Sequence, residues 1–182
     1  MNSLNSKFKK ELLISLKQKL EISNVMAVPK LSKIVVNMGV KDVLANKKNL
    51  EKASVALEQI AGQKPGVTKS KKAIASFKLQ KGEKIGLVTT LRGKRMYDFF
   101  EKLIAVVMPR LRDFHGVKRE SFDGFGNYTL GFIEHTVFPE IDPGKVDIIQ
   151  GLEVTIVTTA KNDKDGLALL EMLGMPFQKV KS

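Results

Sequence analysis

The sequence contains no cysteine, which excludes disulfide bonds and cysteine-ligated zinc and is typical of a protein kept in a reducing compartment. It also lacks any apolar run that approaches the roughly 20 residues of a membrane-spanning helix. The stretch from Met1 to Leu13 has neither the apolar core of a signal peptide nor the Arg-rich pattern of a transit peptide. These absences favour a cytoplasmic protein without a membrane partner.

Acidic residues are scarce relative to basic ones, with 19 Asp and Glu against 31 Lys and Arg, and the formal net charge is +12. A folded chain with this excess of positive charge is typical of proteins that meet a polyanion, either a nucleic acid or an acidic membrane surface. Only five of the basic residues are Arg. Lys offers phosphate a point charge rather than the planar fork that reads a base edge. The composition therefore favours recognition of a phosphate backbone over reading of a base sequence.

Residues that could carry catalysis or hold a metal ion form no recognisable constellation. The two histidines, His115 and His135, have no metal-ligand spacing, so a surface or partly buried role is the simpler interpretation. Residues 62–70 superficially resemble a phosphate-binding loop, but three residues separate the glycines instead of four. Residues 161–166 imitate part of a calcium loop, yet Lys161 would occupy the first ligand position. We expect no catalytic residue, no metal site and no cofactor.

Hydrophobic periodicity predicts a mixture of helices and strands. Runs rich in β-branched residues predict strands at Leu31–Met38, Ile85–Arg92 and Leu152–Thr159. Apolar side chains at helical spacing predict helices that contain Phe8, Leu12, Leu16 and Leu20; Leu50, Ala53, Leu57 and Ile60; Met96, Phe99, Phe100, Leu103 and Val107; and Leu167, Leu170 and Leu173. The fold class is α+β, a mainly antiparallel sheet with helices packed on one face. We expect a single domain over residues 1–182, with an irregular, insertion-like segment at about 110–143.

A lysine-rich stretch between residues 64 and 84 contains a single acid, Glu83. Within it, alternation of apolar and polar residues predicts a strand over Ala73–Leu79, and Gly82 predicts a turn before the strand Ile85–Arg92. The pattern therefore predicts a long basic β-hairpin. Its basic residues are Lys64, Lys69, Lys71, Lys72, Lys78, Lys81 and Lys84.

The less apolar sides of two predicted strands carry polar residues. Thr90 and Arg92 share one side of the strand Ile85–Arg92, and Asn37 lies on the less apolar side of the first strand. An open sheet face that carries Asn, Thr and Arg is suited to contact an RNA backbone.

Seven short motifs occur in one order along the chain. They are Val35–Gly39 (VVNMG), Ala61–Pro65 (AGQKP), Lys69–Lys72 (KSKK), Thr89–Gly93 (TTLRG), Arg110–Phe114 (RLRDF), Ser121–Gly124 (SFDG) and Phe138–Asp142 (FPEID). Each motif alone is weak, but the ordered series is highly specific. Together they resemble the bacterial-type large-subunit ribosomal protein five family over essentially the whole chain.

The resemblance implies an α+β fold, no enzymatic activity, and a ribosome-bound protein that helps attach 5S ribosomal RNA in the central protuberance. Its implied neighbours there are large-subunit ribosomal RNA and other 5S-associated ribosomal proteins. The residues that correspond to 5S contacts are Asn37, Met38, Gly39, Gln63, Lys69, Lys71, Lys72, Thr90 and Arg92.

The resemblance also implies two contacts beyond 5S ribosomal RNA. The hairpin tip, with Lys78, Lys81 and Lys84, corresponds to the part that contacts the elbow of transfer RNA in the peptidyl site. The irregular middle segment is similar to the part that touches a small-subunit head protein and forms an intersubunit bridge. One departure is Phe125, which stands at a loop position where a polar or basic residue is expected.

Two alternatives from other functional classes remain open at this point. An RNA-processing enzyme on a similar scaffold would need a carboxylate cluster or a His-centred acid–base pair, and an activity abolished by a chelator would support it. A general RNA chaperone would bind many RNAs alike. Selectivity for 5S over unrelated RNA separates that alternative from the ribosomal one.

Overall fold

The computed structural model describes residues 12–40, 43, 46, 48–77, 79–112 and 114–178. Phe8, predicted to lie in the first helix, falls outside these residues. The elements in chain order are α2 (Leu13–Lys19), η2 (Val25–Ala27), β1 (Leu31–Gly39), α3 (Lys48–Ala61), β2 (Gly66–Lys69), η3 (Ala75–Phe77), β3 (Lys84–Leu91), α4 (Gly93–Lys102), η4 (Leu103–Val107), η5 (Met108–Arg110), β4 (Tyr128–Phe132), η6 (His135–Val137), η7 (Pro143–Lys145), β5 (Leu152–Thr158) and α5 (Asp163–Met172). In the part of the chain described, no helix is both long and apolar enough to span a bilayer.

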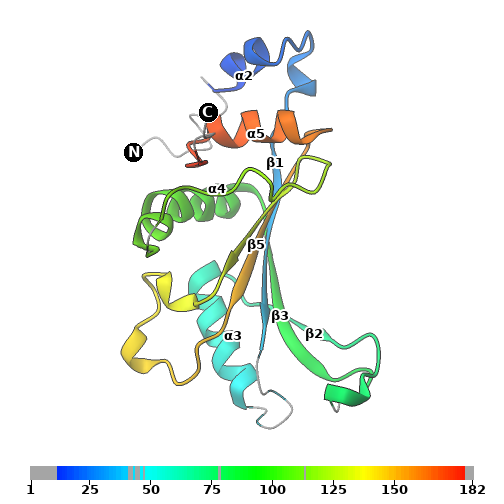
Figure 1. Cartoon of the computed structure of the whole chain (residues 1–182), viewed down its shortest axis with the longest axis vertical. Helices are drawn as coiled ribbons and strands as arrows, with labels where there is room; N and C mark the ends of the chain where they lie inside the picture. The colour runs from blue at the N-terminus through cyan, green and yellow to red at the C-terminus, as the bar shows by residue number, and fades with distance from the viewer. Residues whose placement is uncertain are drawn as a thin grey trace. The chain divides into compact units, whose positions relative to one another are not determined.

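The strands form one five-stranded sheet in the order β2-β3-β1-β5-β4 (Figure 1). Two hydrogen bonds show that β1 runs antiparallel to both neighbours. The Val40 N–H donates to the Ile85 carbonyl, which joins the end of β1 to the start of β3, at 3.1 Å. The Thr159 N–H donates to the Lys30 carbonyl, which joins the end of β5 to the start of β1, at 2.9 Å. The predicted α+β class and antiparallel sheet are confirmed.

The chain divides into two compact units. Unit 1 comprises Met1–Ile34, Leu91–Leu130 and Thr155–Ser182, and unit 2 comprises Val35–Thr90 and Gly131–Val154. The single domain over residues 1–182, with its insertion-like segment at about 110–143, stays a prediction.

The core of unit 2 follows the predicted periodicities. Val36 and Met38 of β1 and Leu87 of β3 are fully buried, and residues between them on these strands are more exposed. Leu57 and Ile60 on the predicted stripe of α3 are buried as well. Each such side chain contributes about 1.5–3 kcal/mol when it leaves water. The buried side of the sheet therefore leaves the opposite side of β1 and β3 available for contacts.

Gly62 ends helix α3 in a left-handed conformation. Gly62 has a φ of +63°, in the left-handed region that glycine adopts without strain. Its N–H donates to the Glu58 carbonyl at 2.8 Å, which satisfies a carbonyl in the last turn of α3. The chain then leaves the helix through Gln63 toward β2.

The long basic hairpin is not formed as predicted. The hairpin partner of β3 is the four-residue strand β2, whereas the described residues of Ala73–Leu79 contain only the isolated bridge Ile74–Leu79 around a short 3-10 turn. The Ser70 N–H donates to the Glu83 carbonyl, and the Gly82 N–H donates to the Ser70 carbonyl. These bonds close the loop at its base, so residues inside it cannot continue the ladder along β3.

Unit 1 contains the two helices that follow β3 and β5. The predicted helix with Met96 and Val107 begins as α4 and ends in a π turn and a 3-10 turn at Pro109, which lacks an N–H and cannot continue an α-helix. Helix α5 contains the predicted stripe and begins after Asn162, whose side chain accepts the Asp165 N–H at 2.8 Å.

Two strands lie where no strand pattern was recognisable from the residues alone. Strand β2 falls in the lysine-rich stretch, and β4 falls in the segment predicted to be irregular. Tyr128, the first residue of β4, is fully buried, and its ring meets Phe122 and Phe177 at centroid distances of 4.8 Å and 5.5 Å. Contacts with residues distant in the sequence stabilise this strand, which explains why local periodicity does not reveal it.

Candidate nucleic-acid interface

Gln63 and Thr90, two residues predicted to contact 5S ribosomal RNA, meet in unit 2 near the end of strand β3. The Gln63 Nε2 donates to the Thr90 carbonyl at 3.2 Å. Gln63 and Thr90 are both half-buried, so the bond holds them side by side while leaving part of each side chain exposed. Asn37 is exposed on β1, the strand next to β3 in the sheet. The structure therefore brings polar groups from the end of α3, from β1 and from β3 to one unit.

Close backbone packing holds the strands of this face together at its centre. A Cβ at Gly86 would lie 2.9 Å from the Met38 carbonyl oxygen and 2.9 Å from the Thr68 Oγ1. Only glycine allows strands β1, β2 and β3 to approach this closely. The Met38 side chain is fully buried and offers no surface to a ligand, whereas the neighbouring Gly39 is exposed.

Arg92 comes directly after strand β3 in the chain but belongs to unit 1. It occupies the N-cap position of α4 in an extended conformation, without a side-chain capping hydrogen bond. Its side chain is exposed. A guanidinium at this position can donate two parallel hydrogen bonds to a phosphate.

The predicted lysine contacts lie on β2, β3 and the loop between them. Lys69 and Lys84 are directly opposite in the β2–β3 register, and Lys71, Lys72 and Lys81 are exposed on the loop. Lys78 lies outside the described residues. The lysines predicted for 5S and those predicted for transfer RNA thus belong to one segment between β2 and β3.

The single acid of the loop is engaged within the loop itself. The Glu83 Oε2 accepts the Gln80 N–H at 2.8 Å, which helps form the turn at Gly82. Gly82 has a φ of +93° and allows the reversal of the chain. The lysines around this turn therefore present a strongly positive surface to any phosphate.

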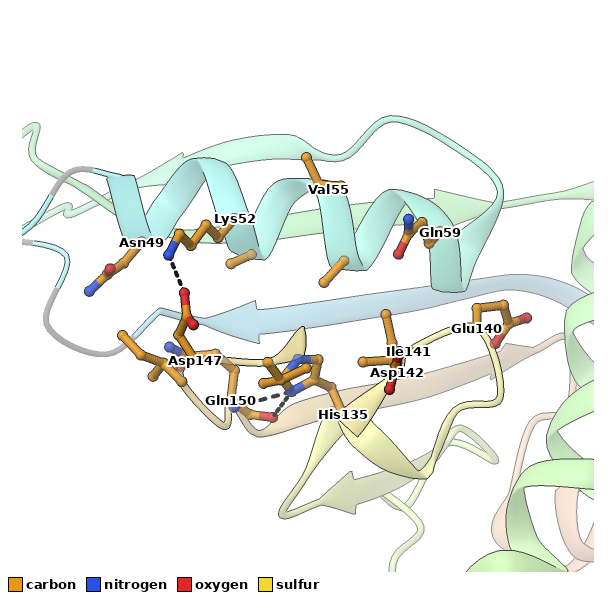
Figure 2. A pocket seen from close by; sticks show the side chains of 14 residues that line it. Asn49, Lys52, Val55, Gln59, His135, Glu140, Ile141, Asp142, Asp147 and Gln150 are labelled. Carbon is orange, nitrogen blue, oxygen red and sulfur yellow. Dashed lines mark hydrogen bonds and ion pairs between the residues drawn. The ribbon is translucent and has the colours of Figure 1, made fainter. Parts of the chain in front are cut away.

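Unit 2 also contains a cavity of about 480 Å³ between α3 and residues 135–150 (Figure 2). The Lys52 ammonium pairs with the Asp147 carboxylate beside it. His135, which we expected at the surface or partly buried, is almost completely buried, with only 3% of its surface exposed. Its Nδ1 accepts the Gln150 N–H at 3.2 Å, and burial lowers its pKa below the usual value. The residues next to His135 in the sequence form no pattern from which its burial could have been predicted.

The described side chains that line the cavity include His135 and three acids, and they form no metal cluster. Within the residues that the structure describes, no three His, Asp or Glu side chains gather closely enough to hold a metal ion. The hydrogen-bonding groups at the His135 Nδ1 are the backbone N–H and carbonyl of Gln150. These contacts connect the His135 ring to the backbone at Gln150, so His135 helps to hold this loop in place.

Comparison with known proteins gives the decisive observation. Residues 24–80 match the family described as "Ribosomal protein L5", and residues 84–177 match the model of the C-terminus of the same ribosomal family. The chain belongs to the ribosomal protein L5 family. The curated "Large ribosomal subunit protein uL5" of Streptococcus uberis is 54% identical over 178 residues, which cover 98% of this chain and 99% of that protein. The protein of the same name from Streptococcus sanguinis is 56% identical over the same shares.

Membership in the L5 family confirms the resemblance drawn from the seven motifs. The family consists of ribosomal structural proteins, so the prediction that the chain is not an enzyme is confirmed. The RNA-processing alternative is thereby excluded. The individual RNA-contact residues stay predictions.

Proposed function

We propose that this L5 family protein is a structural constituent of the large ribosomal subunit, bound to cytoplasmic ribosomes, and that it helps attach 5S ribosomal RNA in the central protuberance. The proposal is supported by the full-length similarity to proteins named "Large ribosomal subunit protein uL5". The net charge of +12 supports a polyanionic partner. Its neighbours would be large-subunit ribosomal RNA and other 5S-associated ribosomal proteins.

The Gln63–Thr90 hydrogen bond is the single observation that carries the proposed site. It holds the Gln63 Nε2 3.2 Å from the Thr90 carbonyl oxygen. Both residues belong to the unit whose strand β1 carries the exposed Asn37. Preorganised donors and acceptors on a rigid sheet recognise the shape of an RNA backbone without loss of side-chain entropy on binding. Gly39 contributes exposed backbone, and Met38 contributes by holding β1 in the core. Lys69, Lys71, Lys72 and Arg92 add charge along the bound phosphates.

A binding titration against 5S ribosomal RNA tests this proposal, with transfer RNA and an unrelated RNA of equal length as competitors. We expect the logarithm of the binding constant to fall linearly with the logarithm of the salt concentration. Each phosphate that the protein neutralises should contribute about 0.7–0.9 to the steepness of that slope. Preference for 5S over the unrelated RNA supports the proposal. Equal affinity for both would instead identify a general RNA chaperone, and a salt slope near zero would contradict phosphate recognition.

We further propose that the end of the β2–β3 loop contacts the elbow of peptidyl-site transfer RNA through Lys78, Lys81 and Lys84. Lys81 and Lys84 are exposed, and lysines neutralise phosphates without reading bases, which suits a partner that changes with each codon. Replacement of the three lysines by Gln should leave subunit incorporation intact and speed dissociation of transfer RNA from reconstituted ribosomes, most clearly at raised salt. An unchanged dissociation rate combined with lost 5S binding would reverse the assignment.

The segment at about 110–143 is proposed to contact a small-subunit head protein and so form an intersubunit bridge. This proposal rests on the family resemblance of the region. Crosslinking between the two subunits from residues in this segment would test it. Crosslinks that reach only RNA would contradict it.

A further inference from the structure

The cavity between α3 and residues 135–150 is lined by an excess of negative charge, although the whole chain carries a net charge of +12. Its lining side chains include three carboxylates, those of Glu140, Asp142 and Asp147, and a single ammonium, that of Lys52. A carboxylate that accepts a hydrogen bond or pairs with Lys52 keeps its charge, so two negative charges remain in excess. The phosphates of a nucleic acid are therefore repelled here, and a cation is attracted.

Two almost completely buried polar side chains line the same cavity. Asn49 is 7% exposed, and its side-chain amide makes no hydrogen bond within the part of the chain that the structure describes. The Nδ1 of the buried His135 contacts the Gln150 backbone, whereas its Nε2 has no hydrogen-bond partner among the described residues. Because Nδ1 accepts the Gln150 N–H, the Nε2 of the neutral ring carries the proton and can donate it to a hydrogen bond.

Unpaired polar groups in a buried position indicate a polar ligand, because such groups are normally hydrogen-bonded. Figure 2 shows Asn49 on α3 and His135 on the segment that faces this helix. The Asn49 amide can both donate and accept a hydrogen bond, and the His135 Nε2 can donate one. Together they match the carbonyl and N–H groups of a polypeptide backbone.

The rest of the cavity wall is largely apolar. Ala53, Val55, Ile141 and Ile148 contribute to it, and Val55 is 57% exposed, so the apolar wall reaches the surface of the protein. The methylene stem of a Lys or Arg side chain can lie along such a wall while its charged end meets a carboxylate. A polypeptide segment with a basic side chain thus supplies backbone amides, an apolar stem and positive charge.

We propose that this cavity binds a basic polypeptide segment of a neighbouring ribosomal protein. The backbone of the segment bonds to Asn49 and His135, and its Lys or Arg side chain meets Glu140 and Asp142. The inference rests on the proposed contact of residues 110–143 with a protein, because Glu140 and Asp142 belong to that segment. It adds α3 to the contact and specifies the chemistry of the bound segment.

Titration of the isotope-labelled full chain with short peptides, followed by amide NMR spectra, tests the proposal. The probe is a pool of acetylated and amidated pentapeptides with Arg at the centre and mixtures of Ala, Val, Leu and Ser elsewhere. Matched pools with Gln or Glu at the centre vary the charge alone, and spermidine supplies positive charge without a carbonyl group.

We expect the Arg pool to shift the amide signals of Asn49 and Gln150 in a saturable manner. The Gln pool should bind about 2- to 5-fold more weakly, and spermidine about 2- to 10-fold more weakly, because each lacks one part of the recognised chemistry. Absence of saturable shifts with the Arg pool would overturn the proposal. Equal affinity for spermidine, or equal or tighter binding of the Glu pool, would overturn it as well.

Two variants of the cavity and one matched control localise the binding. Gln59 is exposed and lines the cavity, so Gln59→Lys adds a repelling charge and should weaken binding of the Arg pool about tenfold or more. Glu140→Gln should weaken it about 2- to 5-fold. Glu58→Gln removes a carboxylate from an exposed position on α3 outside the cavity lining and should bind like the parent.

Circular dichroism of each variant verifies the fold. If Gln59→Lys binds the Arg pool like the parent, or if Glu140→Gln and Glu58→Gln have equal effects, the cavity is not the binding site and the proposal is wrong.

Crosslinking from residues 110–143 and the 5S titration separate this inference from the proposed function. If the Arg pool fails while crosslinks reach a small-subunit protein, only this inference is wrong. If the Arg pool binds in the cavity while crosslinks reach only RNA, the proposed bridge is wrong and the cavity serves another protein neighbour. Gln59→Lys should keep the 5S affinity of the parent, and a loss of that affinity would show that the cavity contacts RNA and overturn the inference.

Discussion

Lys69 and Lys84 lie directly opposite each other at the end of the β2–β3 pair, and both side chains are exposed. Like charges placed opposite each other destabilise an antiparallel pair. A phosphate that binds between them removes the repulsion and converts it into attraction on both sides. The pair is therefore suited to a polyanion, although Lys69 is proposed as a 5S contact and Lys84 as a transfer RNA contact.

Replacement of Lys84 by Gln should stabilise the free protein and weaken its binding to RNA. Loss of the like-charge pair should raise the free energy of unfolding by a few tenths of a kcal/mol, roughly the cross-strand magnitude. Urea unfolding at low salt measures the first effect, and the RNA titration measures the second. Lys84→Arg keeps the charge and serves as the control. A Lys84→Gln protein that is less stable than the parent would contradict the repulsion.

Thr89→Val should increase stability without changing RNA binding. Thr89 is 3% exposed, and its buried Oγ1 has no hydrogen-bond partner among the residues that the structure describes. Valine has nearly the same shape and removes the uncompensated polar group, so we expect a gain of up to about 1 kcal/mol. Thermal unfolding measures the change. No gain, or a loss, would indicate that the hydroxyl is satisfied in solution.

Thr90→Val is the matched substitution on the opposite face of the same strand. Thr90 is half-buried, and its backbone carbonyl is the group that accepts the Gln63 side chain, so valine preserves that bond. We expect 5S binding to weaken by about 0.5–1.5 kcal/mol, the net value of one hydrogen bond, with little change in stability. If Thr89→Val reduces 5S binding and Thr90→Val does not, the proposed face of the sheet is wrong.

Arg92→Ala should cost more 5S affinity than Thr90→Val. The substitution removes a charged donor fork from the N-cap position of α4, where Arg92 makes no side-chain capping bond. We expect a loss of roughly 1–3 kcal/mol in 5S binding and little loss of stability. Arg92→Lys restores the charge without the fork and should recover only part of the affinity. Full recovery by Lys would show that charge alone is recognised.

The buried His135 should make stability depend on pH. Burial lowers its pKa below the usual value near 6.5, although the Gln150 carbonyl, which can accept a hydrogen bond from the protonated ring, and the nearby Glu134 carboxylate partly oppose this shift. Neutral His135 makes its full contribution to the free energy of unfolding above the pKa of a histidine in the unfolded chain. This contribution is lost as pH falls from about 6.5 toward the lowered pKa of His135 in the folded protein, because the unfolded chain takes up the proton first.

Urea unfolding at about pH 7.5 and about pH 5.5, on either side of the unfolded histidine pKa, measures this dependence. His135→Gln should lose less stability between the two pH values than the parent does. The control is His115→Gln, which replaces an exposed histidine and should keep the parent's dependence. Equal pH dependence in the parent and His135→Gln would contradict the assignment.

The sequence alone predicts the elements whose packing repeats along the chain. The stripe with Leu57 and Ile60 and the alternation around Val36 and Leu87 satisfy simple periods, because each of these residues faces one core. The glycine at the end of α3 was likewise predictable, since a positive φ has few other solutions. The motif series then sufficed to predict the family.

The lysine-rich loop marks where that reasoning stops. Alternation over Ala73–Leu79 imitates a strand, but a strand also needs a partner with free backbone groups. Strands β1 and β2 flank β3 on its two sides, and the Ser70–Glu83 contacts close the loop before residue 73. Competition for the two edges of β3 is a property of the folded sheet, and no local pattern records it.

Composition and periodicity by themselves determined that this is a basic, cysteine-free α+β protein with a lysine-rich stretch, because these properties are sums or repeats of single residues. Only the tertiary structure decided that Gln63 meets Thr90, that His135 is buried, and that Phe125 is exposed. Those arrangements depend on contacts between residues that no local period relates. The free energy of such contacts comes from burial and hydrogen-bond geometry, which exist only once the chain has folded.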